Sequence, residues 1–243
     1  MTRGRRPPAF ELTLLDGFEL RADGDPLAVP LAAQRLLAFL ALSARPVLRV
    51  HLAGVLWLES SDEHAFANLR STLWRLRRCC DSLIDASGQS VRLASEVGID
   101  VRCAIDLAHR LVEHPDDATV LDADCDPLRH DLLPDWYDDW VLLERERYRQ
   151  LRLRALDTLC DRLTEAGRLA LAMEVGLASV AGEPLRESAH RAVIRIHLAE
   201  GNKAEAFRQY RLYRTLLHDQ LGLSPSAQME ELVRGLDATE TIG

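Results

Sequence analysis

The chain has 243 residues, of which 47% are hydrophobic and 28% charged, and its formal net charge is −8 at pH 7. This length allows one or two domains, and this composition is typical of a folded globular protein and excludes disorder as the dominant state. The longest apolar stretch, around residues 36–42, is far shorter than the roughly 18 residues of a membrane span, so we expect no membrane segment.

The amino-terminal segment and the cysteines indicate in which cellular compartment the protein is expected. The basic segment from Met1 to Pro8 is followed by a predicted strand and lacks an apolar h-region, so we expect no signal peptide. Five cysteines, an odd number, argue against a disulfide framework and favour a reducing compartment. We therefore expect a cytoplasmic protein.

The charges are distributed unevenly along the chain. Residues 1–102 contain 13 basic and 12 acidic side chains, a net charge of +1, whereas residues 103–243 contain 17 basic and 26 acidic ones, a net charge of −9. Such asymmetry suggests two parts with different partners. Lys203 is the only lysine among the 30 basic residues, so any binding of phosphates depends on arginine.

The first hundred residues predict strands followed by helices. Alternating apolar residues and the turn signal Asp16-Gly17 predict a meander of three or four short strands over residues 10–30. Three helices follow, and after them a hairpin around Gly88 and a further strand near residues 97–101. The three predicted helices cover residues 33–42, 50–58 and 62–80.

The remainder predicts a junction and then helices alone. Residues 104–140 hold a predicted helix over 104–112 and nine aspartates between Asp116 and Asp139. From residue 141 onward, glycine and proline breakers divide the chain into about five helices. Two of these breakers, Gly167 and Gly201, are 34 residues apart, the period of the tetratricopeptide helix pair. A generic antiparallel helical array is the alternative interpretation.

We find no signature of an enzyme, a metal or a cofactor. Phosphate-binding glycine loops, nucleophile elbows and zinc-spaced cysteines are missing from the sequence. The aspartates over 122–126 open like a calcium loop, but Pro127 and Leu133 stand where that loop needs Gly and Glu, so we interpret them as an acidic linker. His190 and His197, and the aromatic residues of 136–140, are expected to serve packing.

The third predicted helix carries the strongest functional signal. Its apolar stripe runs through Phe66, Leu69, Leu73, Leu76 and Cys80, and four arginines but no acid lie between Asn68 and Arg78. Asparagine and arginine suit base edges, and flanking arginines suit phosphates. An ordinary solvated basic face is the alternative. Two short helices before it and an arginine-bearing hairpin after it are the order of a winged helix-turn-helix. The residues predicted opposite the stripe are His64, Asn68, Ser71, Arg75 and Arg78, with Arg70 and Arg77 at its margin.

Both halves resemble known bacterial domains. Residues 10–101 resemble the OmpR-type winged-helix domain through Phe10, Leu15-Asp16-Gly17, Leu52, Leu56-Trp57 and, above all, the run from Asn68 to Arg78. Residues 132–237 resemble the bacterial transcriptional activator domain. The residues that carry this second resemblance are Leu132 to Trp136, Glu144 to Arg147, Glu183 to Glu187, His190 and Arg191, Gly201, Ala206, Tyr210 and Leu221 to Pro225. Both domains in this order resemble the SARP family of pathway-specific regulators.

The resemblance implies a mainly α fold with a small β component: a winged helix-turn-helix followed by a tetratricopeptide-like, all-α helical domain. The corresponding domains are 1–103, an acidic junction 104–131, and 132–243. Larger relatives add an ATPase or a phosphopeptide-binding domain, and we expect the chain ending at Gly243 to lack these. The implied function is a sequence-specific DNA-binding transcriptional regulator, an activator that recruits RNA polymerase. The alternatives are a helical-repeat interaction module whose winged helix does not bind DNA, and a repressor of the same fold.

The implied partners are double-stranded DNA, the RNA polymerase holoenzyme or its sigma subunit, and a second copy of the chain on DNA. In OmpR-type domains the position matching Arg75 faces bases and the position matching Arg77 serves the backbone. The expected base-facing residues are Asn68, Ser71, Arg75 and Arg78. The expected phosphate or wing contacts are Arg70, Thr72, Arg77 and Arg92.

Overall fold

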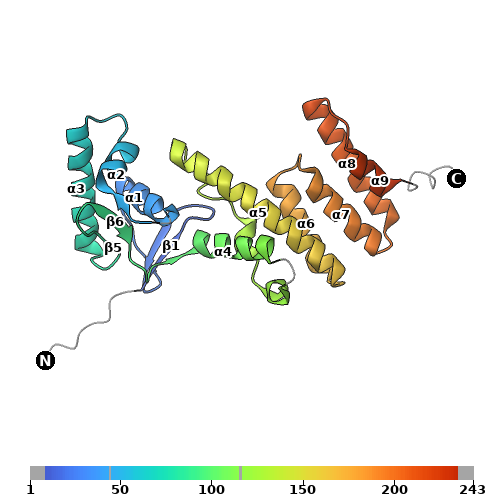
Figure 1. Ribbon diagram of the computed structural model, residues 1–243, viewed down its shortest axis with the longest axis horizontal. Coiled ribbons are helices and arrows are strands. Elements are labelled where there is room, and N and C mark those ends of the chain that lie inside the picture. Colours follow the sequence, from blue (N-terminus) through green and yellow to red (C-terminus); the bar gives the residue numbers. More distant parts are fainter. Residues whose placement is uncertain (1–8, 44, 115–116, 235–243) are drawn as a thin grey trace. The chain divides into compact units, whose positions relative to one another are not determined.

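The computed structural model describes residues 9–43, 45–114 and 117–234 and is mostly helical, with two small sheets near the amino end (Figure 1). The basic segment 1–8 and residues 235–243 lie outside the described residues. The chain forms two compact units. Unit 1 comprises Met1–Ala104 and His130–Tyr148, and unit 2 comprises Ile105–Arg129 and Arg149–Gly243. In the described ranges, no helix combines the length and apolar character that crossing a membrane requires.

Unit 1 begins with the predicted meander. The order of its sheet is β3-β2-β1-β7, with β1 antiparallel to β2 and parallel to β7. Asp16, with a φ of 60°, follows β1 at the predicted turn. The expected strand over 97–101 is shorter than predicted, because a helix already begins at Asp100. The four strands are β1 (Phe10–Thr13), β2 (Glu19–Ala22), β3 (Asp25–Pro26) and β7 (Gly98–Ile99).

The three predicted helices and the hairpin after them are confirmed. The hairpin pairs β5 with β6 antiparallel around Gly88, and β4, just before the second helix, adds to its other side. Leucines of all three helices, among them Leu36, Leu52 and Leu69, are fully buried and form the core of the unit. These elements are α1 (Leu31–Leu42), β4 (Val47–Leu48), α2 (Arg49–Leu56), α3 (Asp62–Cys79), β5 (Ile84–Asp85) and β6 (Ser90–Leu93).

Residues 130–148, far downstream in sequence, complete unit 1. The backbone N–H of Asp16 donates to the carbonyl of Asp131 (2.8 Å), and that of Leu133 donates to the carbonyl of Leu14 (2.9 Å). The Trp140 ring packs edge-on against Phe39, with 5.1 Å between centroids. Residues 132–148 therefore make their contacts with the winged-helix part of the chain, although the sequence pattern groups them with the helices that follow.

The expected packing role of the aromatic residues in this segment holds for two of three. Trp136 stacks on Phe18 at 6.0 Å and meets Trp140 edge-on at 6.5 Å. Tyr137 is different, because 78% of its surface is exposed. The prediction that Tyr137 is a packing anchor is therefore wrong, because most of this residue is accessible to solvent.

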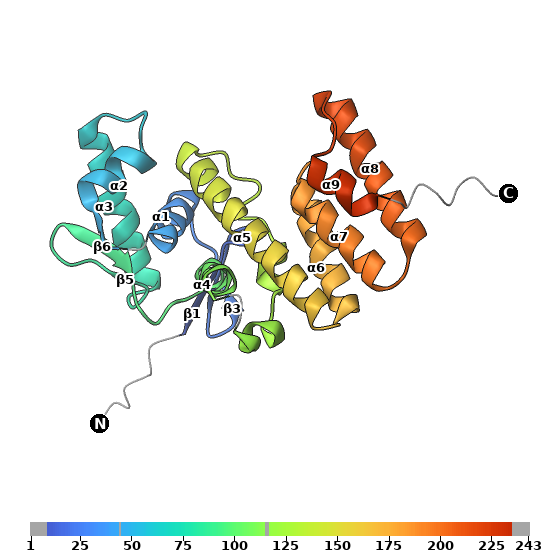
Figure 2. The ribbon, with the colours of Figure 1, turned by 45° about the vertical axis from the view of Figure 1, so that its right-hand side comes forward.

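Unit 2 is helical (Figure 2). About five helices were predicted from residue 141 onward, and the described residues after 138 form five, the first beginning at Asp139. The first of these helices, α5, begins in unit 1 and continues into unit 2, as does α4, which starts at Asp100 and not at the predicted residue 104. The elements are α4 (Asp100–Glu113), the 3-10 turns η1 (Ala118–Asp122) and η2 (Asp126–Arg129), α5 (Asp139–Glu165), α6 (Leu169–Gly182), α7 (Glu187–Ala199), α8 (Lys203–Leu221) and α9 (Ala227–Val233).

The 34-residue repeat corresponds to two equivalent helix pairs. Gly167 turns the chain between α5 and α6, and Gly201 does so between α7 and α8, with φ of 72° and 78°. This left-handed backbone is adopted with little cost only by glycine. Five residues after each turn, Ala172 and Ala206 are fully buried where the helices meet. The pattern of small residues therefore marks real close contacts between helices.

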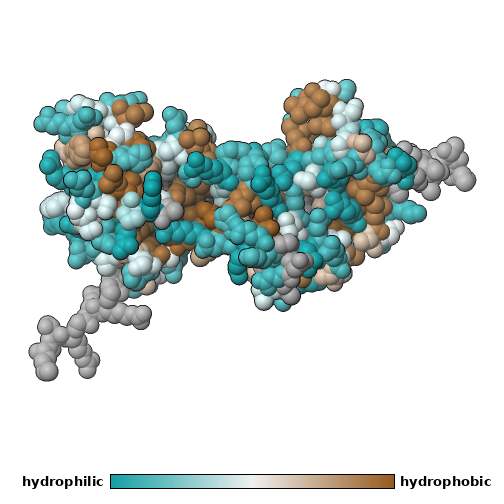
Figure 3. All heavy atoms as spheres, viewed as in Figure 1, coloured by the Kyte–Doolittle hydropathy of each residue, from teal (hydrophilic) through white to brown (hydrophobic). Residues whose placement is uncertain are grey.

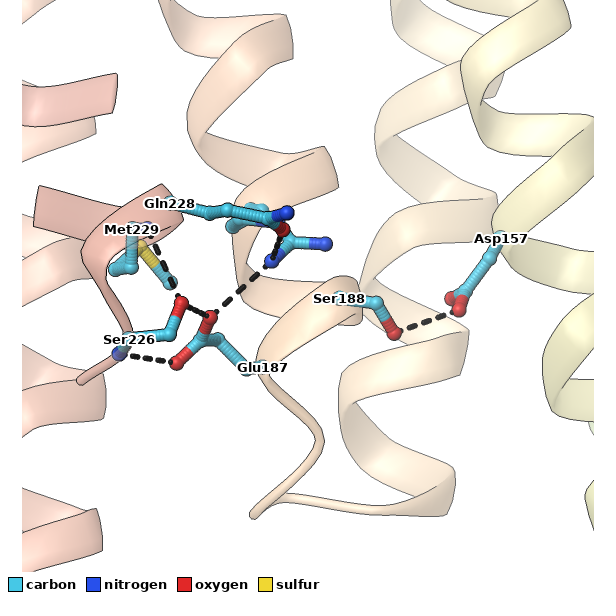
Figure 4. Close-up of polar contacts among 7 residues, drawn as sticks. Asp157, Glu187, Ser188, Ser226, Gln228 and Met229 are labelled. Atoms are coloured by element: carbon cyan, nitrogen blue, oxygen red, sulfur yellow. Dashed lines mark hydrogen bonds and ion pairs between the residues drawn. The ribbon is translucent and has the colours of Figure 1, made fainter. Parts of the chain in front are cut away.

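Polar contacts fasten the last short helix to the rest of unit 2 (Figure 4). The Glu187 carboxylate accepts hydrogen bonds from the backbone N–H of Ser226 (2.8 Å) and from its hydroxyl, and Ser226 also caps α9. Within the rest of unit 2, the Ser188 hydroxyl of α7 donates to Asp157 of α5 at 2.7 Å.

The surface at the C-terminal end of α8 is apolar (Figure 3). Leu221, the last residue of α8, and Leu223, just after it, are both exposed.

Candidate nucleic-acid interface

The local sequence explains why α3 forms and where it starts. Ser61 is its N-cap, and the Ser61 hydroxyl oxygen accepts a hydrogen bond from the backbone N–H of His64. Asp62 and Glu63 lie in the first turn, and arginines lie in the last turn, which matches the helix dipole at both ends. The acidic side chains of α3 are confined to its first turn, so every charged side chain in its last three turns is an arginine.

The structure separates the two faces of α3 largely as predicted. The buried face contains Leu69, Leu73 and Leu76, together with Ala65. The four residues predicted to face bases are all exposed together on the opposite side. These residues are Asn68, Ser71, Arg75 and Arg78.

Two residues of α3 differ from the prediction. Thr72 was expected to contact phosphate, but only 6% of its surface is exposed, and its hydroxyl donates to the carbonyl of Asn68 at 2.8 Å. A hydroxyl bonded to the preceding turn of its own helix is typical of threonine in helices, and it is not available to a phosphate. Phe66, expected in the buried stripe, is exposed, because it lies at the edge of that stripe.

The arginines of α3 have different surroundings. Arg70 and Arg75 are exposed. Arg77 donates to the carbonyl of Ala86 at 3.3 Å, which ties the end of α3 to the hairpin. The guanidinium carbon of Arg78 lies 4.8 Å from the centre of the Trp74 ring, within the range of a cation–π contact.

The hairpin carries the predicted Arg92 on its exposed face. Arg92 donates through both Nε and Nη2 to the carboxylate of Asp85, the residue directly opposite on β5. Arg49 also contacts the hairpin, through a hydrogen bond from its Nε to the carbonyl of Gly88 (3.2 Å). No pattern in the sequence indicates this contact of Arg49, because it depends on the pairing of β4 with β6.

Trp74 is a second residue of this surface that was not among the predicted site residues. It lies on the exposed face of α3, and 57% of its surface is accessible. The signal was present in the sequence: Trp74 is three residues after Ser71 and four before Arg78, so the three share one face of the helix.

The exposed face of α3 consists mainly of side chains that donate hydrogen bonds. Among the described residues, no group of three or more His, Cys, Asp or Glu side chains could hold a metal ion. Burial raises the pKa of the Cys80 thiol, at the end of α3, to about 12, so this thiol is protonated and a poor nucleophile. Guanidinium and amide groups, which donate hydrogen bonds in fixed geometry, dominate the exposed face instead.

Known proteins are similar to this chain over most of its length. Residues 118–236 match the model of the bacterial transcriptional activator domain. The regulatory protein AfsR of Streptomyces coelicolor is 32% identical over 224 residues, which are 86% of this chain and 22% of that protein. AfsR of Streptomyces griseus is 27% identical over 228 residues, or 89% of this chain and 23% of that protein. The chain thus spans less than a quarter of the length of these relatives.

A solved structure shows the same fold. EmbR of Mycobacterium tuberculosis, in complex with a low-affinity phosphopeptide, superimposes with a TM-score of 0.75 at 20% identity, covering 97% of this chain and 67% of that one. The predicted fold, a winged helix followed by tetratricopeptide-like helices, is confirmed. The match of residues 118–236 to the activator domain and the similarity to the AfsR regulators support the resemblance of the chain to the SARP family.

Proposed function

We propose that the chain is a sequence-specific DNA-binding transcriptional regulator that activates transcription by recruiting RNA polymerase. The observation that carries the proposal is the exposed face of α3, where Asn68, Arg75 and Arg78 are accessible side by side. A helix with this face fits the major groove, where arginine reads guanine and asparagine reads adenine. The proposal includes no enzymatic activity and no cofactor, and it places the protein in the cytoplasm, with the DNA.

In this proposal, the second half of the chain binds protein partners and not DNA. Residues 103–243 carry a net charge of −9, so DNA phosphates repel this half on average. Stacked helix pairs such as those joined at Gly167 and Gly201 present surfaces that hold partner segments. The partners we propose are the RNA polymerase holoenzyme, through its sigma subunit, and a second copy of the chain on DNA.

A DNA-binding assay with the full chain tests the first part. We expect purified protein to prefer one fragment from near its own gene over random DNA of equal length, with log K falling linearly against log salt concentration. A double variant, Arg75→Ala with Arg78→Ala, should lose this preference. Arg208→Ala, which removes an exposed arginine of α8 in unit 2, is the matched control and should bind as the parent does.

Absence of any preference in the parent would favour the alternative of an interaction module whose winged helix does not bind DNA. Transcription with purified RNA polymerase on the preferred fragment then tests the sign of regulation. Stimulation by the parent but not by the double variant supports an activator. Inhibition at the same protein concentrations would make the chain a repressor of the same fold.

A further inference from the structure

We propose that Trp74 is a specificity-determining residue that contacts the 5-methyl group of a thymine in the major groove. This inference rests on the proposed function, because it requires α3 to enter that groove. Trp74 is the largest side chain on the exposed face of α3 and is 57% accessible. Ser71 and Arg78, one helical turn away on either side, are both predicted base-facing residues, so a helix that brings them to the bases also brings Trp74 there.

The chemistry of the indole ring limits which groups on the bases Trp74 can recognise. Tryptophan has a single N–H donor and no acceptor, so it cannot form the paired hydrogen bonds that arginine and asparagine make with bases. Its remaining surface is apolar. In the major groove the only apolar group that distinguishes one base pair from another is the thymine methyl. Burying this methyl against the ring removes apolar surface of both partners from water.

Arg78 gives the ring a defined orientation. Its guanidinium carbon lies 4.8 Å from the ring centroid, so the cation covers part of the indole and limits its rotation. The same guanidinium retains N–H groups that can reach the O6 and N7 of a guanine. Trp74 and Arg78 therefore form a unit suited to a thymine next to a guanine that Arg78 contacts.

Replacement of single thymines by deoxyuridine in the preferred DNA fragment tests the proposal, because it removes only the methyl group and leaves every hydrogen-bonding atom in place. For the parent chain, we expect one thymine per bound copy whose replacement weakens binding about fourfold, the effect of one buried methyl. Trp74→Ala should bind both versions of that site equally. Trp74→Phe, which keeps an aromatic ring, should retain part of the difference.

Tyr137→Ala is the matched control, because it removes an exposed aromatic ring of unit 1 outside α3 and should keep the full fourfold effect. An unchanged thermal midpoint of Trp74→Ala, expected for an exposed residue, shows that the variant is folded.

Three results would overturn the inference: a fourfold effect that persists in Trp74→Ala, a parent chain insensitive to every deoxyuridine, or an altered oligomeric state of Trp74→Ala with an unchanged deoxyuridine profile. The last result would make Trp74 a protein contact. Failure of the parent to prefer any DNA is a separate outcome, which overturns the proposed function itself.

Discussion

The guanidinium of Arg92 and the carboxylate of Asp85 face each other across the β5–β6 hairpin, with 2.7 Å between Nη2 and Oδ2. Both side chains are about half exposed, so the pair contributes little to stability. The pair also lowers the positive charge of the wing, the β5–β6 hairpin, because the arginine that β6 contributes is offset by an anion at contact distance. The wing is therefore less attractive to phosphates than its arginine alone suggests.

Asp85→Asn should raise the affinity for all DNA sequences, because it leaves the charge of Arg92 without its offset. The slope of log K against log salt concentration should become steeper by up to about one, and Arg92→Ala should have the opposite effect. Filter binding to random DNA over a range of salt concentrations measures both. Parent-like salt slopes in both variants would mean that the wing does not approach the DNA.

Arg75→Ala should relax base discrimination and cost about 1–3 kcal/mol at the preferred site, because Arg75 lies opposite the buried face of α3. Competition binding between specific and random DNA measures the loss as a ratio of dissociation constants. Arg208→Ala in unit 2 is the control. A ratio equal to that of the parent would show that Arg75 does not read a base.

Arg35→Ala should destabilise unit 1. One nitrogen of Arg35 donates to the carbonyl of Leu56 at 2.8 Å, and another forms an ion pair with Asp138, so this side chain connects α1 to the end of α2 and to the downstream segment. The two charged side chains are 27% and 23% exposed, so solvent screens part of the interaction, and we expect a loss of about 1–2 kcal/mol.

Urea unfolding followed by tryptophan fluorescence measures this loss in unit 1 alone, because all four tryptophans of the chain belong to that unit. Arg21→Ala is the control. It removes an exposed ion pair with Glu19 on β2 and should change the free energy of unfolding by less than about 0.5 kcal/mol. Equal effects of the two substitutions would contradict a connecting role for Arg35.

His190 should make the stability of unit 2 depend on pH. Burial lowers the pKa of His190 below its ordinary value of 6.5, because desolvation disfavours the imidazolium. The neutral ring is fully bonded: Nε2 donates to the carbonyl of Pro184 and Nδ1 accepts from the amide of Gln209, both at 2.9 Å. As pH falls through 6.5, the unfolded chain binds a proton at this position before the folded chain does. The free energy of unfolding should therefore decrease from about pH 7 to pH 5.

The test compares the parent with His190→Gln in urea unfolding at several pH values, followed by circular dichroism. The variant should be less stable at pH 7, because it loses the packing of the imidazole against Tyr213 (4.6 Å between centroids). Its stability should also fall less between pH 7 and pH 5. An equally steep decrease in the variant would assign the pH dependence to other groups.

Local patterns in the sequence were sufficient for most of the fold. The helical spacing of Leu69, Leu73 and Leu76 defined the buried face of α3, and the interval from Gly167 to Gly201 defined the helix pairs. The first feature depends on residues within one or two turns of each other, and the second on a fixed interval along the chain. Thr72 shows the limit of such reasoning, because a polar side chain on the inner face can satisfy its hydroxyl within the helix and be buried.

The contacts that the sequence did not reveal are those between distant segments. Arg49 reaches the wing only through the pairing of β4 with β6, and Asp138 meets Arg35 from more than a hundred positions away. Neither a periodicity nor a turn signal encodes such pairings. The offset of Arg92 by Asp85 is a local contact within the predicted hairpin, but it depends on the strand register, which places the two residues opposite each other.

The contribution of residues 130–148 to unit 1 has a consequence for protein synthesis. The hydrogen bond from Asp16 to Asp131 joins positions 115 residues apart. The amino-terminal strands therefore cannot complete their contacts until residues 130–148 have been synthesised. At 5–20 residues per second, translation from residue 104 to residue 148 takes roughly two to nine seconds. During that interval Leu14, Leu15 and Phe39 lack the downstream residues that cover them, so the nascent winged helix is expected to be a substrate for chaperones until Tyr148 has emerged.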